Sequence, residues 1–236
     1  MKDRIQEYNS RFAELSVAEV INCLAQEFPA QVKFSSAFGQ EDQVITDIIF
    51  RNQLPVEVFT LDTGRLFPET YELMEKTRIR YNQEISPYFP RSEDVESLLN
   101  EKGFFSFYTS VENRKECCYI RKVGPLKRAL RNTKVWITGL RAAQSDNRQH
   151  LDLFEWDEAN QVIKYNPILY WTYEAMLAYL DDYKVPYNTL HDKGYVSIGC
   201  QPCTRAIMPD ESPRAGRWWW ENSQKECGLH TVTIKK

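Results

Sequence analysis

Short apolar runs alternate with helical patterns along most of this chain, and that alternation limits its fold more than any other feature. QVKFSSAFG, VEVFTLDTG and KVWITGL each predict a strand that ends in small or turn-forming residues. QEDQVITDIIFRN and FPETYELMEKTRIRY, which follow the first two runs, have the spacing of amphipathic helices. Strands that alternate with helices predict an α/β fold with a single, largely parallel sheet.

Composition and charge narrow the class of protein. The 236 residues suffice for one α/β domain, and 42% hydrophobic and 13% aromatic residues are typical of a globular chain. A net charge of -3 argues against a nucleic-acid or membrane-surface binder, since both need a basic excess. The opening MKDRIQEYNSRFAEL lacks the apolar run of a signal peptide, and no membrane span is found, so we expect a cytoplasmic protein.

Three predicted strand ends carry residues that suit an anion: SSAFGQED (35–42), LDTGR (61–65) and GLRAAQSDNR (139–148). Each loop alone also fits an ordinary turn. Together, at the carboxyl ends of parallel strands, they would gather backbone N–H groups and arginines at one edge of the sheet. The patterns GxxxxGK[ST] and GxGxxG are missing, so neither a P-loop NTPase nor a dinucleotide-binding Rossmann enzyme is supported.

Four of the six cysteines form two pairs: the adjacent Cys117 and Cys118, and the CxxC of Cys200 and Cys203. In a cytoplasmic chain such pairs favour metal ligands or redox catalysts, and a disulfide between neighbours is strained. Four thiolates that converge would suit zinc or a 4Fe-4S cluster. Adjacent thiols fit the separate irons of a cube more easily than one small ion. Two buried thiols plus a redox CxxC is the alternative that spacing leaves open.

The other two cysteines have different predicted roles. Cys23 lies on the apolar face of a predicted helix, where we expect it to pack in the core. Cys227, in KECGLH, lies near Lys225 and His230, whose charges would favour a thiolate and hence a nucleophile. An idle surface thiol is the alternative for Cys227.

Basic side chains surround the adjacent cysteines in RKECCYIRK. A charge run of this kind is often no more than a solvated helix face. Here the cations would also stabilise four anionic thiolates and could reach an anionic substrate. Lys122 follows Cys118 by four positions, so a helix would place both on one face.

The last quarter of the chain is rich in turns and aromatic residues, and it contains both the CxxC and Cys227. We expect residues 1–199 to form the α/β domain, and residues 200–236 to form an irregular segment of the same domain. A metal centre would hold such a segment in place.

The order of the motifs resembles that of a known family. The motifs are FSSAFGQED, LDTGRLFPETY, ECCYIRKVGPLKRAL, GLRAAQS, GCQPCT, ESPRAGRWWWE and KECGLH. They closely resemble the assimilatory adenylyl-sulfate (APS) reductases, the cluster-containing branch of the APS/PAPS reductase family, across most of the chain. PAPS reductases are similar in LDTG and KECGLH but lack the cysteine pairs. The resemblance implies a Rossmann-like sheet of the adenine nucleotide alpha-hydrolase type.

The resemblance also implies an activity: thioredoxin-dependent reduction of APS to sulfite and AMP, in sulfate assimilation and cysteine biosynthesis. Cys227 would attack the sulfur of APS, expel AMP and become a cysteine S-sulfonate. Reduced thioredoxin, or a glutaredoxin-like protein, would then release sulfite. One 4Fe-4S cluster, bound by Cys117, Cys118, Cys200 and Cys203, would be a structural and electrostatic element. No flavin or NAD(P) is implied.

Other site residues are likewise implied by the resemblance. The residues around the sulfate would be Lys122, Arg141, Arg214, Arg217 and His230. The residues that hold the adenosine and its phosphate would be Ser35, Ser36, Phe38, Gly39, Gln40, Glu41, Asp42, Leu61, Asp62, Thr63, Gly64, Arg65, Gly139 and Arg141. The acidic pair Glu41 and Asp42 would repel the 3′-phosphate of PAPS, which predicts a preference for APS; a dual APS/PAPS reductase is the alternative.

Two other classes of protein stay open. ATP-using PP-loop enzymes share the strand, loop and helix start but carry SGGxDS where this chain has SSAFGQED. An iron-sulfur or zinc regulatory module would not need Cys227. We expect no nucleic-acid or membrane partner, and the sequence leaves open whether the chain forms a homo-oligomer.

Overall fold

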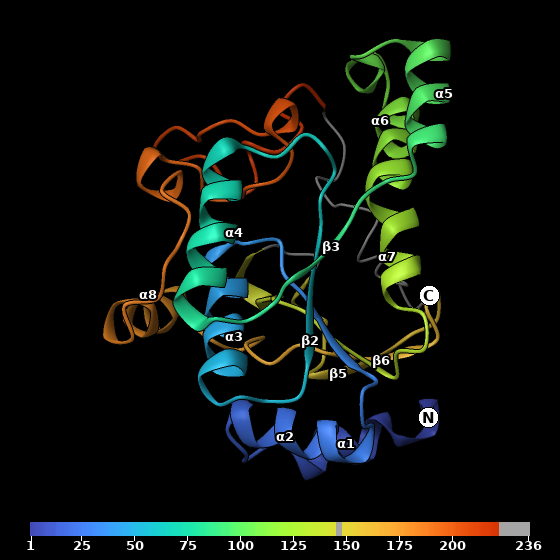
Figure 1. Cartoon of the computed structure of the whole chain (residues 1–236). Coiled ribbons are helices and arrows are strands. Elements are labelled where there is room, and N and C mark those ends of the chain that lie inside the picture. Colours follow the sequence, from blue (N-terminus) through green and yellow to red (C-terminus); the bar gives the residue numbers. More distant parts are fainter. Residues whose placement is uncertain (145–147, 222–236) are drawn as a thin grey trace. The chain divides into compact units, whose positions relative to one another are not determined.

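The computed structural model describes residues 1–144 and 148–221 (Figure 1). The chain divides into two compact units. The first comprises Met1–Thr60, Glu69–Ser86 and Leu130–Asn188; the second comprises Leu61–Pro68, Pro87–Ala129 and Thr189–Lys236, described as far as Glu221. This division differs from the expected one at residue 199, because residues 61–68 and 87–129 group with the C-terminal stretch. That both parts form one domain stays a prediction.

A six-stranded sheet has the order β3-β2-β1-β4-β6-β5. Its strands are β1 (Val32–Ser35), β2 (Glu57–Leu61), β3 (Ser86–Tyr88), β4 (Val135–Ile137), β5 (Phe154–Asp157) and β6 (Val162–Tyr165). β1 is parallel to β2 and β4, with Phe34 opposite Val58 and Ile137, and β4 is parallel to β6. The predicted α/β fold with a largely parallel sheet is confirmed, and the antiparallel β5 is an addition that the sequence did not predict.

In the first unit, a helix follows each of the first two strands, as predicted, and other helices precede β1 or follow β6. The helices of this unit are α1 (Ile5–Arg11), α2 (Val17–Glu27), α3 (Gln40–Arg51), α4 (Pro68–Tyr81) and α8 (Tyr173–Asp182), with short 3-10 turns at Lys2–Arg4 and Ala142–Gln144. Ser16 and Glu19 form a capping box that starts α2, and Thr172 caps α8. In Figure 1, α3, α4 and α8 lie on the same side of β1 and β2.

The core of the first unit packs apolar helix faces against the strands. Phe34, Ile137 and Ile163 are fully buried in neighbouring strands. Cys23 packs against this core, as its place on an apolar helix face predicted. No helix in the described residues is long and apolar enough to cross a membrane.

As far as it is described, the second unit holds short helices, with a π-helical turn between two of them, and a largely irregular stretch towards Glu221. Its helical elements are α5 (Ser92–Lys102), η2 (Ser106–Tyr108), α6 (Val111–Cys118), a π-helical turn (Tyr119–Val123), α7 (Gly124–Ala129), η6 (His191–Lys193) and η7 (Gln201–Cys203). Beyond η7, an isolated antiparallel bridge joins Thr204 to Arg217. The irregular segment predicted from turns and aromatic residues is present as far as Glu221.

A π-helical turn interrupts the helix directly after the adjacent cysteines. Ser110 caps α6 by accepting a hydrogen bond from the Asn113 amide. At the far end, the Gly124 N–H donates to the Tyr119 carbonyl, five residues back. The next residue, Pro125, has no N–H with which to continue an α-helical ladder, so a local departure from α-helix is favoured here.

Candidate active site and cysteine cavity

One buried carboxylate closes the loop after β1. Asp42 Oδ2 accepts a hydrogen bond from the Ala37 amide at 2.7 Å, and the Gly39 amide also donates to this carboxylate. Ser36 Oγ accepts from the amide of Phe38, a residue with φ of 59°. Burial raises the pKa of Asp42 to about 7, although the amide donors favour its charged form. The buried Asp42 side chain therefore stabilises the conformation of this loop through its hydrogen bonds to backbone amides.

The GLR motif packs against this loop. A Cβ added to Gly139 would lie 2.1 Å from Asp42 Oδ1, so only glycine fits there. Arg141 Nε donates to Glu41 Oε1 at 2.9 Å, and Arg141 is 5% exposed. Arg141 Nη1 is buried without a hydrogen-bond partner among the described residues. A buried guanidinium N–H of this kind suits an anionic ligand.

These contacts correct the argument that Glu41 and Asp42 repel a 3′-phosphate. The carboxylate of Asp42 faces backbone amides inside the loop, and that of Glu41 is paired with Arg141. The two residues therefore do not present a pair of free negative charges. A preference between APS and PAPS needs another basis.

Two further predicted nucleotide-binding residues have partners within the first unit. Ser35 Oγ accepts from the Trp136 indole N–H at 2.8 Å, and Gln40 Oε1 accepts from the Tyr173 hydroxyl at 3.3 Å. Gly39 caps α3 without a side-chain hydrogen bond. The first-turn N–H groups of α3 and the Arg141 guanidinium are therefore groups in this unit that suit an anion.

The LDTGR loop belongs to the second unit from Leu61 onward. Asp62 Oδ1 accepts from the Gly64 amide at 2.8 Å. Gly64 has φ of 70°, a backbone conformation that is unfavourable for residues with a side chain. Thr63 Oγ1 accepts from the Arg65 amide and lies 3.2 Å from Cys200 Sγ. A loop predicted to bind the nucleotide thus also contacts a predicted metal ligand.

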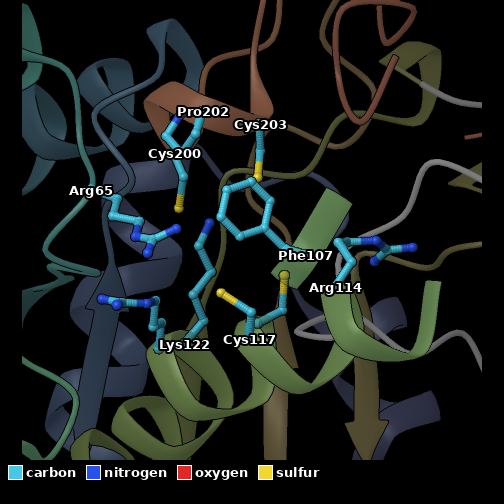
Figure 2. Close-up of a pocket in the computed structure, with 10 residues that line it drawn as sticks. Arg65, Phe107, Arg114, Cys117, Lys122, Cys200, Pro202 and Cys203 are labelled. Carbon is cyan, nitrogen blue, oxygen red and sulfur yellow. The ribbon is translucent and has the colours of Figure 1, made fainter. Parts of the chain in front are cut away.

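Four cysteines line one small cavity of the second unit (Figure 2). Cys117 and Cys118 end α6, Cys200 directly precedes η7, and Cys203 is the last residue of η7. The other lining residues are Arg65, Phe107, Arg114, Arg121, Lys122 and Pro202. The structure thus brings the two cysteine pairs together, with cations from α6 and the π-helical turn beside them.

Burial shifts the pKa values of several side chains that line this cavity. Burial raises the pKa of Cys117, and it raises the pKa of Cys203 to about 12, although nearby cations act in the opposite direction. The pKa of Arg65 is lowered, by burial first and then by the charge of Arg121. Arg121 Nη1 donates to the Thr63 carbonyl at 2.6 Å. Burial therefore favours the neutral thiols of Cys117 and Cys203 unless a bound metal replaces their protons.

The donors around the cavity indicate which kind of metal group it fits. Within residues 1–144 and 148–221, no three His, Cys, Asp or Glu side chains are grouped to hold a metal ion. In the same ranges, Arg121 Nε, Arg217 Nε and Trp218 Nε1 are buried without hydrogen-bond partners. Trp218 packs in one cluster with Cys117 and Cys203. Four thiols beside unpartnered N–H donors fit a sulfur-rich anionic cluster better than one small ion.

The predicted sulfate-binding residues fall in different places. Lys122 lines the cysteine cavity, and Figure 2 shows its side chain among the cysteines. Arg217 is 6% exposed, and its Cζ lies 4.7 Å from the centroid of the Trp218 ring. The Arg214 carbonyl accepts from the Arg217 amide at 3.0 Å. Arg141 belongs to the first unit, and the predicted nucleophile Cys227 and its neighbour His230 lie outside the described residues.

One buried ion pair was missed by the sequence analysis. Arg114 Nε and Nη2 donate to Glu221 Oε1 and Oε2, each at 2.9 Å, and the two side chains are 3% and 4% exposed. Arg114 stood within a basic run, and no signal separated it from its neighbours. Glu221 ends the WWWE motif, whose carboxylate follows three aromatic residues and was a usable hint of a buried acid.

Comparison with known proteins decides the family. Residues 31–206 match the model described as the phosphoadenosine phosphosulfate reductase domain. The adenosine 5′-phosphosulfate reductase of Allochromatium vinosum is 47% identical over 92% of this chain and 85% of its own length. The chain belongs to the phosphoadenosine phosphosulfate reductase family. The resemblance found in the motifs is thereby confirmed.

Two solved structures resemble this chain to different degrees. The phosphoadenylyl-sulfate (PAPS) reductase of Candida auris matches with a TM-score of 0.73 and 30% identity, over 88% of this chain and 98% of that one. The FMN adenylyltransferase of Candida glabrata matches with a TM-score of 0.57 at 17% identity, over 93% of this chain and 75% of that one. The second match shows a shared fold alone.

Proposed function

We propose that this protein is an oxidoreductase that reduces APS to sulfite and AMP, in sulfate assimilation and cysteine biosynthesis. The observation that carries the proposal is the 47% identity, over 92% of the chain, to a relative named adenosine 5′-phosphosulfate reductase. Identity to the solved PAPS reductase is lower, at 30%. That difference favours APS over PAPS as the substrate.

The chemistry needs one nucleophile and one external dithiol. The Cys227 thiolate attacks the sulfur of APS, the bond between that sulfur and the phosphate oxygen breaks, and AMP leaves with the bonding electrons. A thiolate of the dithiol protein then attacks Cys227 Sγ and displaces sulfite, which leaves a mixed disulfide. The second thiol resolves that disulfide, so two thiols are oxidised as the sulfur is reduced by two electrons. Reduced thioredoxin, or a glutaredoxin-like protein, has the required chemistry.

The cationic residues would neutralise the substrate. The anhydride of APS carries negative charge on both phosphate and sulfate, and charge grows on AMP as it leaves. Arg141 has a buried N–H without a partner among the described residues, which supports a role in binding an anion. Lys122, Arg214, Arg217 and His230 would serve the sulfate.

A 4Fe-4S cluster would be held by Cys117, Cys118, Cys200 and Cys203. When bound, it would supply negative charge and fix the cysteine pairs relative to each other. The buried, unpartnered donors of Arg121, Arg217 and Trp218 in the described residues support this assignment. We propose a structural and electrostatic role for the cluster, with electrons for the reduction supplied by the dithiol protein.

The deciding experiment traps the proposed intermediate. Anaerobically purified protein is incubated with APS labelled with radioactive sulfur, without any reductant, and the protein-bound label is counted after gel filtration. We expect label on the wild type, none on Cys227→Ser, and release of labelled sulfite when reduced thioredoxin is added.

Cys23→Ser is the matched control, because Cys23 packs against the core of the first unit rather than lining the cysteine cavity. It should bind as much label as the wild type. An unlabelled wild type, or ATP turnover in place of sulfite release, would refute the proposed function. Comparable kcat/KM for PAPS would refute the preference for APS.

A further inference from the structure

A buried ion pair fixes the chain just before the segment that carries Cys227. The Arg114 guanidinium donates two parallel hydrogen bonds to the Glu221 carboxylate, each 2.9 Å long. Although burial alone would lower the pKa of Arg114, its hydrogen bonds to Glu221 raise it, and Cys118 acts in the same direction. A two-point contact of this kind fixes orientation as well as distance.

The residues between the CxxC and Glu221 reinforce this attachment. The Trp218 amide donates to the Cys203 carbonyl at 3.2 Å, and the Glu221 amide donates to the Trp218 carbonyl at 2.9 Å. The Cζ of Arg114 lies 4.5 Å from the centroid of the Trp218 ring. Trp218 also has a φ of 42°, a conformation that a bulky residue adopts only when its surroundings enforce it. The chain at Trp218 and Glu221 is therefore attached to both cysteine pairs.

Cys227 follows Glu221 by six positions. At about 3.6 Å per extended residue, that length of chain spans at most roughly 22 Å. The position of Glu221 consequently limits where the Cys227 thiol can go. A nucleophile tethered to a fixed point meets a bound substrate at a higher effective concentration than one on a longer free chain.

We propose that Arg114 and Glu221 are a positioning pair for the reaction: they hold the base of the Cys227 segment at the cysteine cavity, so that the thiol reaches bound APS. This inference rests on the proposed function and deepens it. Arg114 would act through Glu221 and the chain that follows, without touching the substrate.

Glu221→Gln tests the pair with little change of shape. Glutamine keeps one acceptor for the Arg114 guanidinium but loses the second hydrogen bond and the charge. At saturating APS, we expect the single-turnover rate of Cys227 labelling to fall at least tenfold, while KM for APS stays within about twofold. The rate at which iodoacetamide alkylates Cys227 in the absence of APS should also stay within about twofold, because the thiol itself is unchanged.

Glu211→Gln is the matched control. Glu211 accepts two hydrogen bonds from Arg205, at 2.8 and 2.7 Å, within the same unit, and neither residue lines the cysteine cavity. This variant should label at the wild-type rate. It separates loss of the particular pair from loss of any arginine-carboxylate pair.

Iron content and thermal unfolding of every variant are measured alongside. A wild-type labelling rate in Glu221→Gln would overturn the inference, and so would a slow rate accompanied by loss of iron, since the pair would then serve the cavity alone. Failure of the proposed function has a different signature, because the wild type itself would not be labelled.

Discussion

The loop after β1 and the cysteine cavity differ in whether the buried polar groups at each have hydrogen-bond partners among the described residues. In the loop, Asp42 accepts from backbone amides, and Glu41 is paired with Arg141. Around the cavity, Arg121, which lines it, and Arg217 and Trp218, which do not, keep buried N–H groups without partners in the described ranges. Burial opposes ionisation of the Cys117 and Cys203 thiols. The polar groups of the loop are largely satisfied by the protein itself, whereas the donors around the cavity could be satisfied by a bound group.

That difference separates two kinds of functional site. A loop whose polar groups are satisfied can keep its shape before a ligand arrives. Arg141, which packs against this loop, has a buried Nη1 without a partner among the described residues, and that group is available to an anion. A cavity of unsatisfied donors and neutral thiols gains free energy when a group fills it. We therefore expect loss of a cavity thiol to abolish binding of a resident group, and changes in the loop to alter stability or its dependence on pH.

The largest effect should come from removing one cavity cysteine. Cys203→Ser replaces a buried thiol with a poorer iron ligand, so we expect most of the bound iron and its broad visible absorption to be lost. Labelling by APS should fall by about 100-fold or more, because the segment anchored to Cys203 loses its support. Iron analysis of Cys203→Ser and the Cys23→Ser control checks this. One zinc per chain and no iron in the wild type would contradict the cluster.

A smaller effect is expected from Lys122→Ala. Lys122 lines the cavity with the four cysteines, and we expect its charge to stabilise an anion beside them. Loss of one such cation should lower kcat/KM for APS by about 100-fold while the iron content stays the same. Lys127→Ala is the matched control, since the Lys127 ammonium lies over the Tyr119 ring, 5.6 Å from its centroid, and does not line the cavity. Nearly unchanged turnover in Lys122→Ala would end the proposed link between the cluster and the sulfate.

The parts of the fold that the sequence predicted are those with a clear apolar period. The strands β1 and β2 and the helices α3 and α4 have it, and they lie where expected. The short β5 and β6 were missed because charged residues interrupt their pattern: Lys164 and Glu155 pair across the two strands at 3.1 Å. The helix α5 was missed because a single residue, Leu98, is buried along it.

In the candidate site, too, the residues with a distinctive sequence pattern could be predicted and the others could not. Cysteine is rare and its spacing is distinctive, so the convergence of Cys117 and Cys203 could be predicted. The pairing of Arg114 with Glu221 spans 107 positions, and neither residue type is distinctive. The role of Asp42 was mistaken because a sequence does not tell which of two neighbouring carboxylates turns inward.

The smallest effect concerns the pH dependence of stability, and Asp42 should account for it. Its pKa rises from 3.8 to about 7 on folding, so between these values the folded chain keeps a proton that the unfolded chain loses, and stability falls as the pH rises. From pH 5.5 to 7.5 the loss from this group amounts to about 2 kcal/mol. Asp42→Asn keeps an oxygen that can accept from the Ala37 amide but cannot titrate. In anaerobic urea unfolding, the stability of Asp42→Asn relative to the wild type should therefore increase by about 2 kcal/mol over this range. Parallel pH profiles for the two proteins would mean that Asp42 is ionised in the folded loop, and that its amide donors outweigh its burial.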